Sequence, residues 1–320
     1  MMLIGHDDAW AAWRKALAGS RMHHAWMLAG RQGLGKIQFA MQAARELVAE
    51  TGIPQPAGEH PDILVLKRLP KDEKEVKKRD EGKPFERKRN ISVAQIREMQ
   101  RRLTTRPTLG SRRAIIIDPA DDLEKSASNA LLKSLEEPPA GTYFVLVVHR
   151  PARLLPTIRS RCRILRFPTL PDQELSQFLS REAPEADDAT RQAAIVAAGG
   201  SPGLALDFVE RDLGNLFSLM KAIMRDGDPE FDLRGRLAEA IGARPNREKI
   251  QATLDLARAV LADAVGGAQT AQYPQITSAH SELVRLTGQA PTYNFDAGLL
   301  VAEIGSLLAS AAAPRDRANV

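Results

Sequence analysis

Three glycines and a lysine form the pattern with the clearest chemical meaning in this sequence. Gly30, Gly33, Gly35 and Lys36 complete the spacing G-x-x-x-x-G-K, after an apolar run and before residues with helical periodicity. Backbone N–H groups of such a loop can surround phosphate oxygens, and the lysine can reach the outer phosphates. The residues therefore predict a phosphate-binding loop of the P-loop type over residues 30–36.

Two positions depart from the pattern of a loop that hydrolyses nucleotide. Ile37 follows the lysine, where a working P-loop has Ser or Thr to bind Mg²⁺, and isoleucine offers no oxygen. Asp118 ends an apolar strand, but Pro119 stands where a glutamate would polarise the attacking water. Phosphoryl transfer depends on positioning and metal electrostatics, so we expect no intrinsic ATPase activity. The loop is then either a structural relic or a silent site for ATP or ADP, and Asp118 is a degenerate acid beside it.

The elements that would position these residues alternate between strand and helix. Apolar strand runs alternate with stretches of helical spacing, the strands at 24–29, 63–66, 113–118 and 143–148 and the helices at 8–18, 36–50, 91–103 and 126–137. Continuous apolar strands between helices are typical of a parallel sheet that is covered on both faces. Residues 1–168 therefore predict an α/β domain.

The strand pattern ends at Pro168. Residues 169–210 predict a small helical lid, and residues 211–320 predict an all-α domain. Its clearest helix places five apolar side chains along one face: Ile250, Leu254, Ala257, Leu261 and Val265.

The positive charge of the chain is concentrated in one short stretch. The net charge is +5, from 45 basic and 40 acidic residues. Residues 67–89, which we call the charged insertion, contain 11 Lys or Arg and 6 Asp or Glu, so the remainder holds 34 of each sign. With few apolar residues, the charged insertion predicts a solvated loop. Contact with DNA phosphates is the alternative interpretation.

Composition also limits the kind of site and the compartment. Cys162 is the one cysteine in the chain, which excludes an internal disulfide and a cysteine-rich zinc site. There is no run of 18 apolar residues and no pattern of a secretory signal. We expect a cytoplasmic protein without a membrane partner.

Three further strings carry a resemblance to a known family. These are residues 24–30 before the glycine-rich loop, the stretch SNALLKSLEEPP at 128–139, and Ser160-Arg161-Cys162. In order and spacing they resemble bacterial clamp-loader subunits of the AAA+ class over residues 4–208. Within that family, His60-Pro-Asp62 and residues 91–97 are similar to the delta-prime type rather than to the motor. The absent Ser or Thr and Glu agree with that type, as does Gly203, which stands near where motors have a sensor arginine.

The resemblance implies an architecture and a role. The α/β domain would be an AAA+ domain, followed by the lid and by a collar domain. The chain would be a non-catalytic stator of the DNA polymerase III clamp loader, helping ATP-driven loading of a sliding clamp onto primed DNA. Its partners would be the gamma/tau motor, the delta subunit, the clamp, and DNA through the assembled complex. No cofactor would be required, and zinc, which some members hold with four cysteines, is not expected. The alternatives are an ATP-hydrolysing motor and a stand-alone DNA-binding module.

The same resemblance assigns a role to the Ser160-Arg161-Cys162 motif. Arg161 would act as an arginine finger that reaches the γ-phosphate of ATP in a neighbouring motor, a role suited to a permanently charged fork of donors. The alternative is that Arg161 pairs with an acid of its own chain. We expect Cys162 to be a small buried residue rather than a nucleophile, because the sequence shows no base for it.

Overall fold

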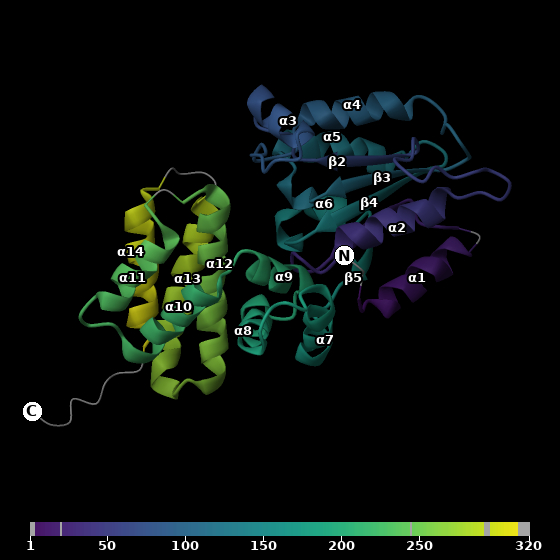
Figure 1. The fold of residues 1–320 in the computed structure, drawn as a ribbon. Coiled ribbons are helices and arrows are strands. Elements are labelled where there is room, and N and C mark those ends of the chain that lie inside the picture. Colours follow the sequence, from purple (N-terminus) through teal and green to yellow (C-terminus); the bar gives the residue numbers. More distant parts are fainter. Residues whose placement is uncertain (1–3, 20, 244, 291–294, 313–320) are drawn as a thin grey trace, which may run out of the picture. The chain divides into compact units, whose positions relative to one another are not determined.

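Residues 4–19, 21–243, 245–290 and 295–312 are described by the computed structural model (Figure 1). The chain divides into two compact units, residues 1–169 and residues 170–320. The first unit contains all the described strands, and the described regular structure of the second is helical. In the described part of the chain, no helix is both long and apolar enough to cross a bilayer.

The first unit contains a parallel sheet of five strands. The order across the sheet is β2-β3-β4-β1-β5, and each neighbouring pair is parallel. The strands are β1 (Ala25–Ala29), β2 (Ile63–Lys67), β3 (Arg113–Asp118), β4 (Thr142–Val148) and β5 (Arg163–Arg166). The four predicted strands are confirmed. The fifth, β5, was not predicted, because it has four residues, begins and ends with arginine and buries only Leu165.

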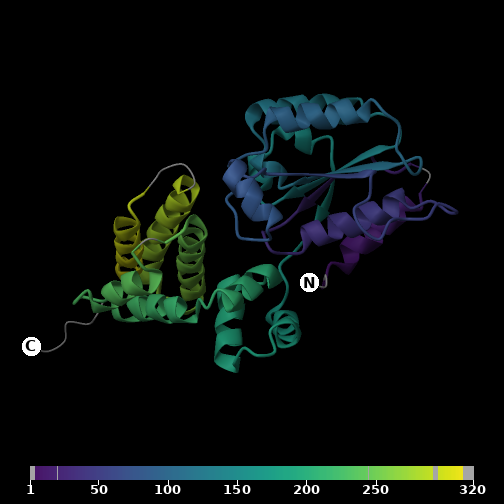
Figure 2. The same ribbon diagram turned by 45° about the horizontal axis from the view of Figure 1, so that its top comes forward.

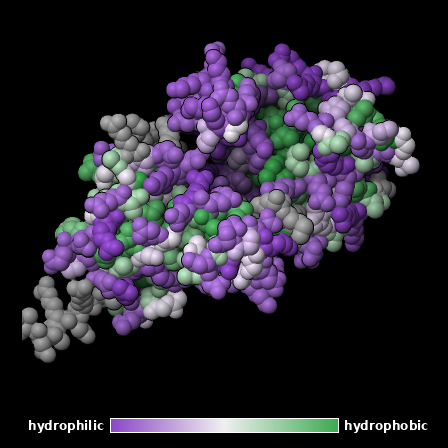
Figure 3. All heavy atoms as spheres, in the orientation of Figure 1, coloured by the Kyte–Doolittle hydropathy of each residue, from purple (hydrophilic) through white to green (hydrophobic). Residues whose placement is uncertain are grey.

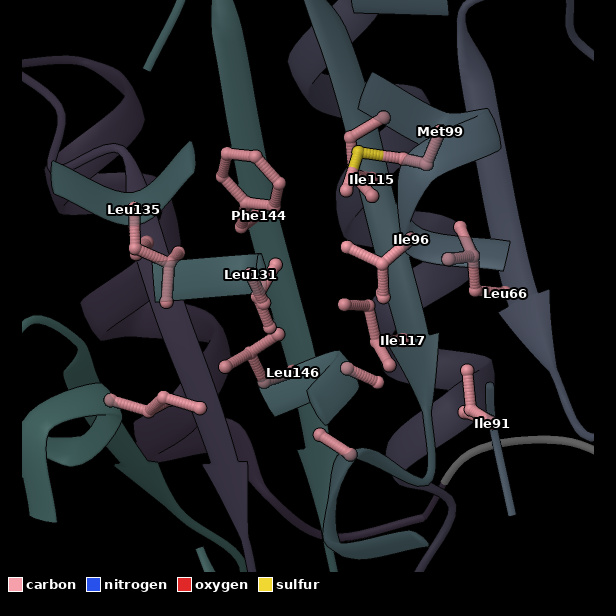
Figure 4. Close-up of a cluster of buried hydrophobic side chains, with 14 of the residues drawn as sticks. Leu66, Ile91, Ile96, Met99, Ile115, Ile117, Leu131, Leu135, Phe144 and Leu146 are labelled. Atoms are coloured by element: carbon pink, nitrogen blue, oxygen red, sulfur yellow. The ribbon is translucent and has the colours of Figure 1, made fainter. Parts of the chain in front are cut away.

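Helices cover both faces of this sheet (Figures 1 and 2). On one face lie α1 (Asp7–Leu17) and α2 (Lys36–Val48), and on the other lie α4 (Val93–Leu103) and α5 (Lys125–Glu136). Alternate residues of a strand point to opposite faces. Accordingly, Ile115 and Ile117 pack with α4 and α5, as Figure 4 shows, whereas Ile116 packs on the side of α2. The sheet is parallel and helices cover both of its faces, as such a sheet requires. The predicted α/β class is therefore confirmed.

A buried carboxylate anchors the connection between α4 and β3. The side chain of Asp62 accepts hydrogen bonds from the backbone N–H groups of Thr108 and Leu109, at 2.6 and 2.8 Å. Asp62 is almost fully buried, and its own N–H donates to His60 Nδ1 at 3.0 Å. The His60-Pro-Asp62 string therefore has a structural role, because it fixes a loop that lies more than forty residues further along the chain.

The charged insertion is folded, so the prediction of a solvated loop was wrong. It contains α3 (Glu73–Asp80), and an antiparallel bridge joins Pro70 to Arg87. The Asp72 side chain caps α3 by accepting from the Glu75 N–H at 3.0 Å. Glu75 is buried and accepts from the Glu86 N–H at 2.6 Å and from Lys78 Nζ at 2.7 Å. The charged insertion is therefore held by a helix cap and by paired charges rather than by an apolar core. Figure 3 shows hydrophilic side chains over α3.

The remaining elements of the first unit are short. They are the helix α6 (Pro156–Arg159) and the 3₁₀ turns η1 (Ala120–Asp122) and η2 (Pro151–Arg153). They follow β3 and β4 in the sequence and lead toward β5. Of the site residues described below, Asp121 lies in η1.

The second unit consists of eight described α-helices and two 3₁₀ turns: α7 (Asp172–Glu182), α8 (Asp188–Ala198), α9 (Pro202–Glu210), α10 (Gly214–Asp226), α11 (Asp232–Ile241), α12 (Arg247–Ala264), η3 (Val265–Gly267), η4 (Thr270–Gln272), α13 (Tyr273–Gln289) and α14 (Ala297–Ser310). In α12 the predicted apolar face buries Leu254, Ala257 and Leu261, but Val265 lies in η3 and is exposed. The helix α8 contacts both α10 and α12. The division of this unit into a lid (169–210) and a collar (211–320) remains a prediction.

Replacing Glu75 by Ala should loosen the charged insertion without affecting the sheet. The variant removes the acceptor for the Glu86 N–H, and hydrogen bonds to charged groups are stronger than neutral ones. We expect hydrogen exchange of the Glu86 amide to become faster on the order of tenfold. Exchange of the β3 amides should not change. Glu73→Ala is the matched control, since Glu73 is exposed on the same helix; equal protection of Glu86 in both variants would contradict the proposed anchor.

Candidate functional site

The glycine-rich loop joins β1 to α2, as the sequence predicts. Gly33 and Gly35 have φ angles of 80° and 74°, a left-handed conformation that glycine adopts without strain. Gly35 is also the residue before the first turn of α2. Gly30 is required for another reason. A Cβ at Gly30 would lie 2.4 Å from the carbonyl oxygen of Phe167, the residue that follows β5.

Lys36 is buried and bonded to its own loop. Its Nζ donates to the carbonyl oxygen of Gly30 at 2.7 Å and also to that of Arg31. Burial lowers the pKa of Lys36 to about 8, although the nearby carboxylates of Asp121 and Asp118 act in the opposite direction. The ammonium group is therefore held by two loop carbonyls and by the field of two acids.

Acidic residues follow β3 at the same edge of the sheet. Asp118 ends the strand, and burial raises the pKa of its carboxyl group. Its Oδ2 lies 3.8 Å from Nζ of Lys67, at the end of the adjacent strand β2. The side chain of Asp121, in η1, is only 1% exposed and its Oδ1 accepts from the His149 N–H at 2.9 Å. Arg150 Nε lies 3.6 Å from Asp121 Oδ2.

His149 follows β4 directly and completes this group. Burial, followed by the positive charge of Lys36, lowers the pKa of His149 to about 4, so its imidazole is neutral near pH 7. The sequence analysis missed Asp121, His149 and Arg150. A signal was available, because the residues that follow parallel strands meet at one edge of the sheet, which is where such folds bind ligands.

The residues at the two altered positions, Ile37 and Pro119, offer no side-chain oxygen to a metal ion. Ile37 is partly buried and packs against the apolar cluster between α2 and the sheet. It gives that core a hydrocarbon side chain where a metal would need an oxygen. Pro119 has no side-chain carboxylate to orient a water. The loop thus retains its backbone shape, while these two positions contribute to packing and chain geometry.

The Ser160-Arg161-Cys162 motif lies between α6 and β5. The Ser160 hydroxyl donates to the carbonyl oxygen of Thr157 at 3.1 Å, and Arg161 Nη1 donates to the same oxygen at 2.9 Å. Arg161 Nη2 lies 2.7 Å from Oε1 of Glu136, the last residue of α5, and the side chains of the pair are 35% and 47% exposed. Pairing with an acid of the same chain is therefore present. The finger role of Arg161 remains a prediction.

Cys162 faces the interior of the first unit. It is partly buried and packs against the cluster that α4 and α5 form with the sheet. Burial raises the pKa of its thiol to about 12, so the thiolate is scarce near neutral pH. The residue therefore anchors the backbone on the C-terminal side of Arg161.

Comparison with known proteins identifies a family model and relatives that are similar to this chain. A family model described as "DNA polymerase III, delta subunit" matches residues 5–171. The "DNA polymerase III subunit delta'" of Escherichia coli is 30% identical over 302 residues, covering 90% of this chain and 78% of that protein. The protein of the same description from Pseudomonas aeruginosa is 33% identical over 208 residues, 59% of this chain and 58% of that protein.

One solved structure supports the fold. It is the crystal structure of a "DNA polymerase III, gamma subunit-related protein" from Thermotoga maritima, with a TM-score of 0.54. The alignment covers 94% of this chain and 99% of that one, at 18% identity. At this identity the similarity concerns the fold alone.

The lowered pKa of Lys36 predicts how stability depends on pH. Folding lowers this pKa from its ordinary 10.5 to about 8, so between these values the unfolded chain binds more protons. Stability should therefore rise with pH across that window. Relative to Lys36→Met, the free energy of unfolding of the wild type should increase by about 2–3 kcal/mol from pH 7 to pH 10.5. Denaturant titrations of both proteins measure this difference, and a value independent of pH would contradict the lowered pKa.

Proposed function

The chain belongs to the family of DNA polymerase III delta-prime subunits, and from this we propose that it is a non-catalytic subunit of a bacterial clamp loader. In this role it would act as a stator, a rigid member of the complex that hydrolyses no nucleotide. Its partners would be the gamma/tau motor and the delta subunit, and through the assembled complex the sliding clamp and primed DNA. It would work in the cytoplasm.

The altered loop supports the non-catalytic part of this proposal. Ile37 packs into the core and Pro119 follows Asp118, so neither position offers a side-chain oxygen to a metal ion or a water. The ammonium of Lys36 is bonded to two carbonyls of its own loop. We propose that the chain needs no magnesium nucleotide, zinc or other cofactor of its own.

We also propose that Arg161 is an arginine finger supplied to a neighbouring motor. The observation that supports this role is that its guanidinium is partly exposed. Arg161 follows the short helix α6, and its side chain is 35% exposed beside Glu136. A guanidinium stays charged at any physiological pH and offers five N–H donors, so it can bind phosphate oxygens while it keeps a contact within its own chain. Ser160 and Cys162 would hold the backbone on either side.

The isolated chain should not turn over ATP. With Mg²⁺ present, phosphate release should match that of Lys36→Ala, because the wild type already lacks the hydroxyl and the carboxylate that the reaction needs. A phosphate-release assay at matched protein concentration measures this. Magnesium-dependent turnover that disappears in Lys36→Ala would instead identify the chain as a motor.

Substituting Arg161 by Ala should impair the motors of the assembled loader. An arginine finger is worth about 10³–10⁵ in rate at the site that it serves, so turnover stimulated by clamp and primed DNA should fall strongly. The measurement uses the loader reconstituted with the variant, with assembly checked by size-exclusion chromatography. Arg159→Ala, in the preceding helix, is the control for loss of charge and should keep wild-type turnover. If Arg161→Ala assembles and turns over normally, Arg161 is not a finger.

A further inference from the structure

Two stretches that lie far apart in the sequence meet at the end of α5. Glu136 is the last residue of α5, and Arg161 comes directly after the helix α6 and Ser160. The helices α5 and α6 contact each other, and the Glu136 carboxylate lies 2.7 Å from Arg161 Nη2. This contact joins the SNALLKSLEEPP string to the Ser160-Arg161-Cys162 motif, although the sequence gives no sign that the two act together.

Both partners of this pair stand on well-anchored backbone. On the side of Glu136, Leu135 is buried and its carbonyl oxygen accepts from His24 Nε2 at 2.9 Å. On the other side, the Arg161 N–H donates to the carbonyl oxygen of Ile158 at 3.1 Å, and Cys162 packs into the core. Side chains placed on rigid elements keep their relative orientation better than side chains on loops.

The two contacts of Arg161 fix the plane of its guanidinium. Nη1 donates to the carbonyl oxygen of Thr157 and Nη2 pairs with Glu136. The hydrogen bond to Thr157 uses one of the five N–H groups, and Nη2 is engaged in the ion pair, so N–H donors remain for an anion. Two contacts on separate nitrogen atoms restrict rotation of a planar group, which a single contact would leave free to turn.

The value of the pair lies in orientation rather than in stability. Both side chains are more than a third exposed, and ion pairs of this kind contribute little to folding. A long arginine side chain that is oriented in advance loses less rotational freedom when it binds its target. Such preorganisation is worth roughly 3- to 10-fold in the rate of a step that depends on the contact.

We propose that Glu136 is a positioning residue for Arg161, holding the guanidinium in the orientation that meets the phosphates of a nucleotide bound by a neighbouring subunit. The inference rests on the proposed role of Arg161 as a finger. Glu136 itself touches no substrate in this scheme. Its effect passes entirely through the orientation of Arg161.

The test is a set of variants in the reconstituted loader. With clamp and primed DNA, Glu136→Ala should lower kcat for ATP about 3- to 10-fold and leave KM nearly unchanged, because the finger acts on the transition state rather than on binding. Glu136→Gln keeps an oxygen that can accept from Nη2 and should retain most of the activity. Glu137→Ala is the matched control, since Glu137 is the next residue and is also exposed. It should behave like the wild type.

A double variant shows whether the effect passes through Arg161. If it does, Glu136→Ala should cause no further loss in an Arg161→Ala background. An equal fractional loss in both backgrounds would overturn the inference, as would wild-type turnover in Glu136→Ala. Increased turnover would overturn it too, since Glu136 would then restrain the finger. If Arg161→Ala alone has no effect, the proposed finger fails; a defect in Arg161→Ala without one in Glu136→Ala removes only the positioning role.

Discussion

The direction of the strands is the constraint on which the rest of this structure depends. All five strands of the sheet are parallel, and helices pack on both faces, so the inner strands β1, β3 and β4 have almost no room for polar side chains. Polar groups collect where the strands end. The loop after β1, the acids after β3 and His149 after β4 therefore meet at one edge, with Lys36 buried among them. The cost of burying this ammonium is offset in part by two loop carbonyls and by the carboxylates nearby, and the remainder lowers its pKa to about 8.

This arrangement explains how a glycine-rich loop can persist beside Ile37 and Pro119. Gly30 allows the chain after β5 to approach closely, because any side chain there would collide with Phe167. Gly33 and Gly35 have a left-handed backbone conformation, and the ammonium of Lys36 donates to the carbonyl oxygen of Gly30 in the same loop. Ile37 contributes to the core. Each of these residues has a structural reason to be present, so the loop sequence alone does not show that nucleotide binds.

The sequence predicted the elements whose apolar residues are periodic, and it failed where structure depends on pairing. Four of the five strands and the helices on both faces of the sheet have clear apolar patterns, whereas β5 is short and its side chains are mostly exposed. The charged insertion folds through a cap at Asp72 and a buried acid at Glu75, which its composition does not reveal. Motif spacing and strand context pointed to Lys36 and Asp118, and the family resemblance pointed to Arg161. Asp121 was missed although its place after β3 was a usable signal, whereas the importance of Glu136 depends on a partner that only the fold brings close.

Lys36 and Arg161 are two cations of the first unit that differ in burial and in the groups that their donors contact. The ammonium of Lys36 is buried, its pKa is lowered to about 8, and its donors bond to carbonyls of its own loop. The guanidinium of Arg161 lies partly in solvent and holds one carbonyl and one carboxylate. An ammonium group can lose its proton when it is buried, but a guanidinium remains charged. Of the two, only Arg161 therefore combines permanent charge, exposure and spare donors, which are the properties that binding a phosphate on another subunit requires.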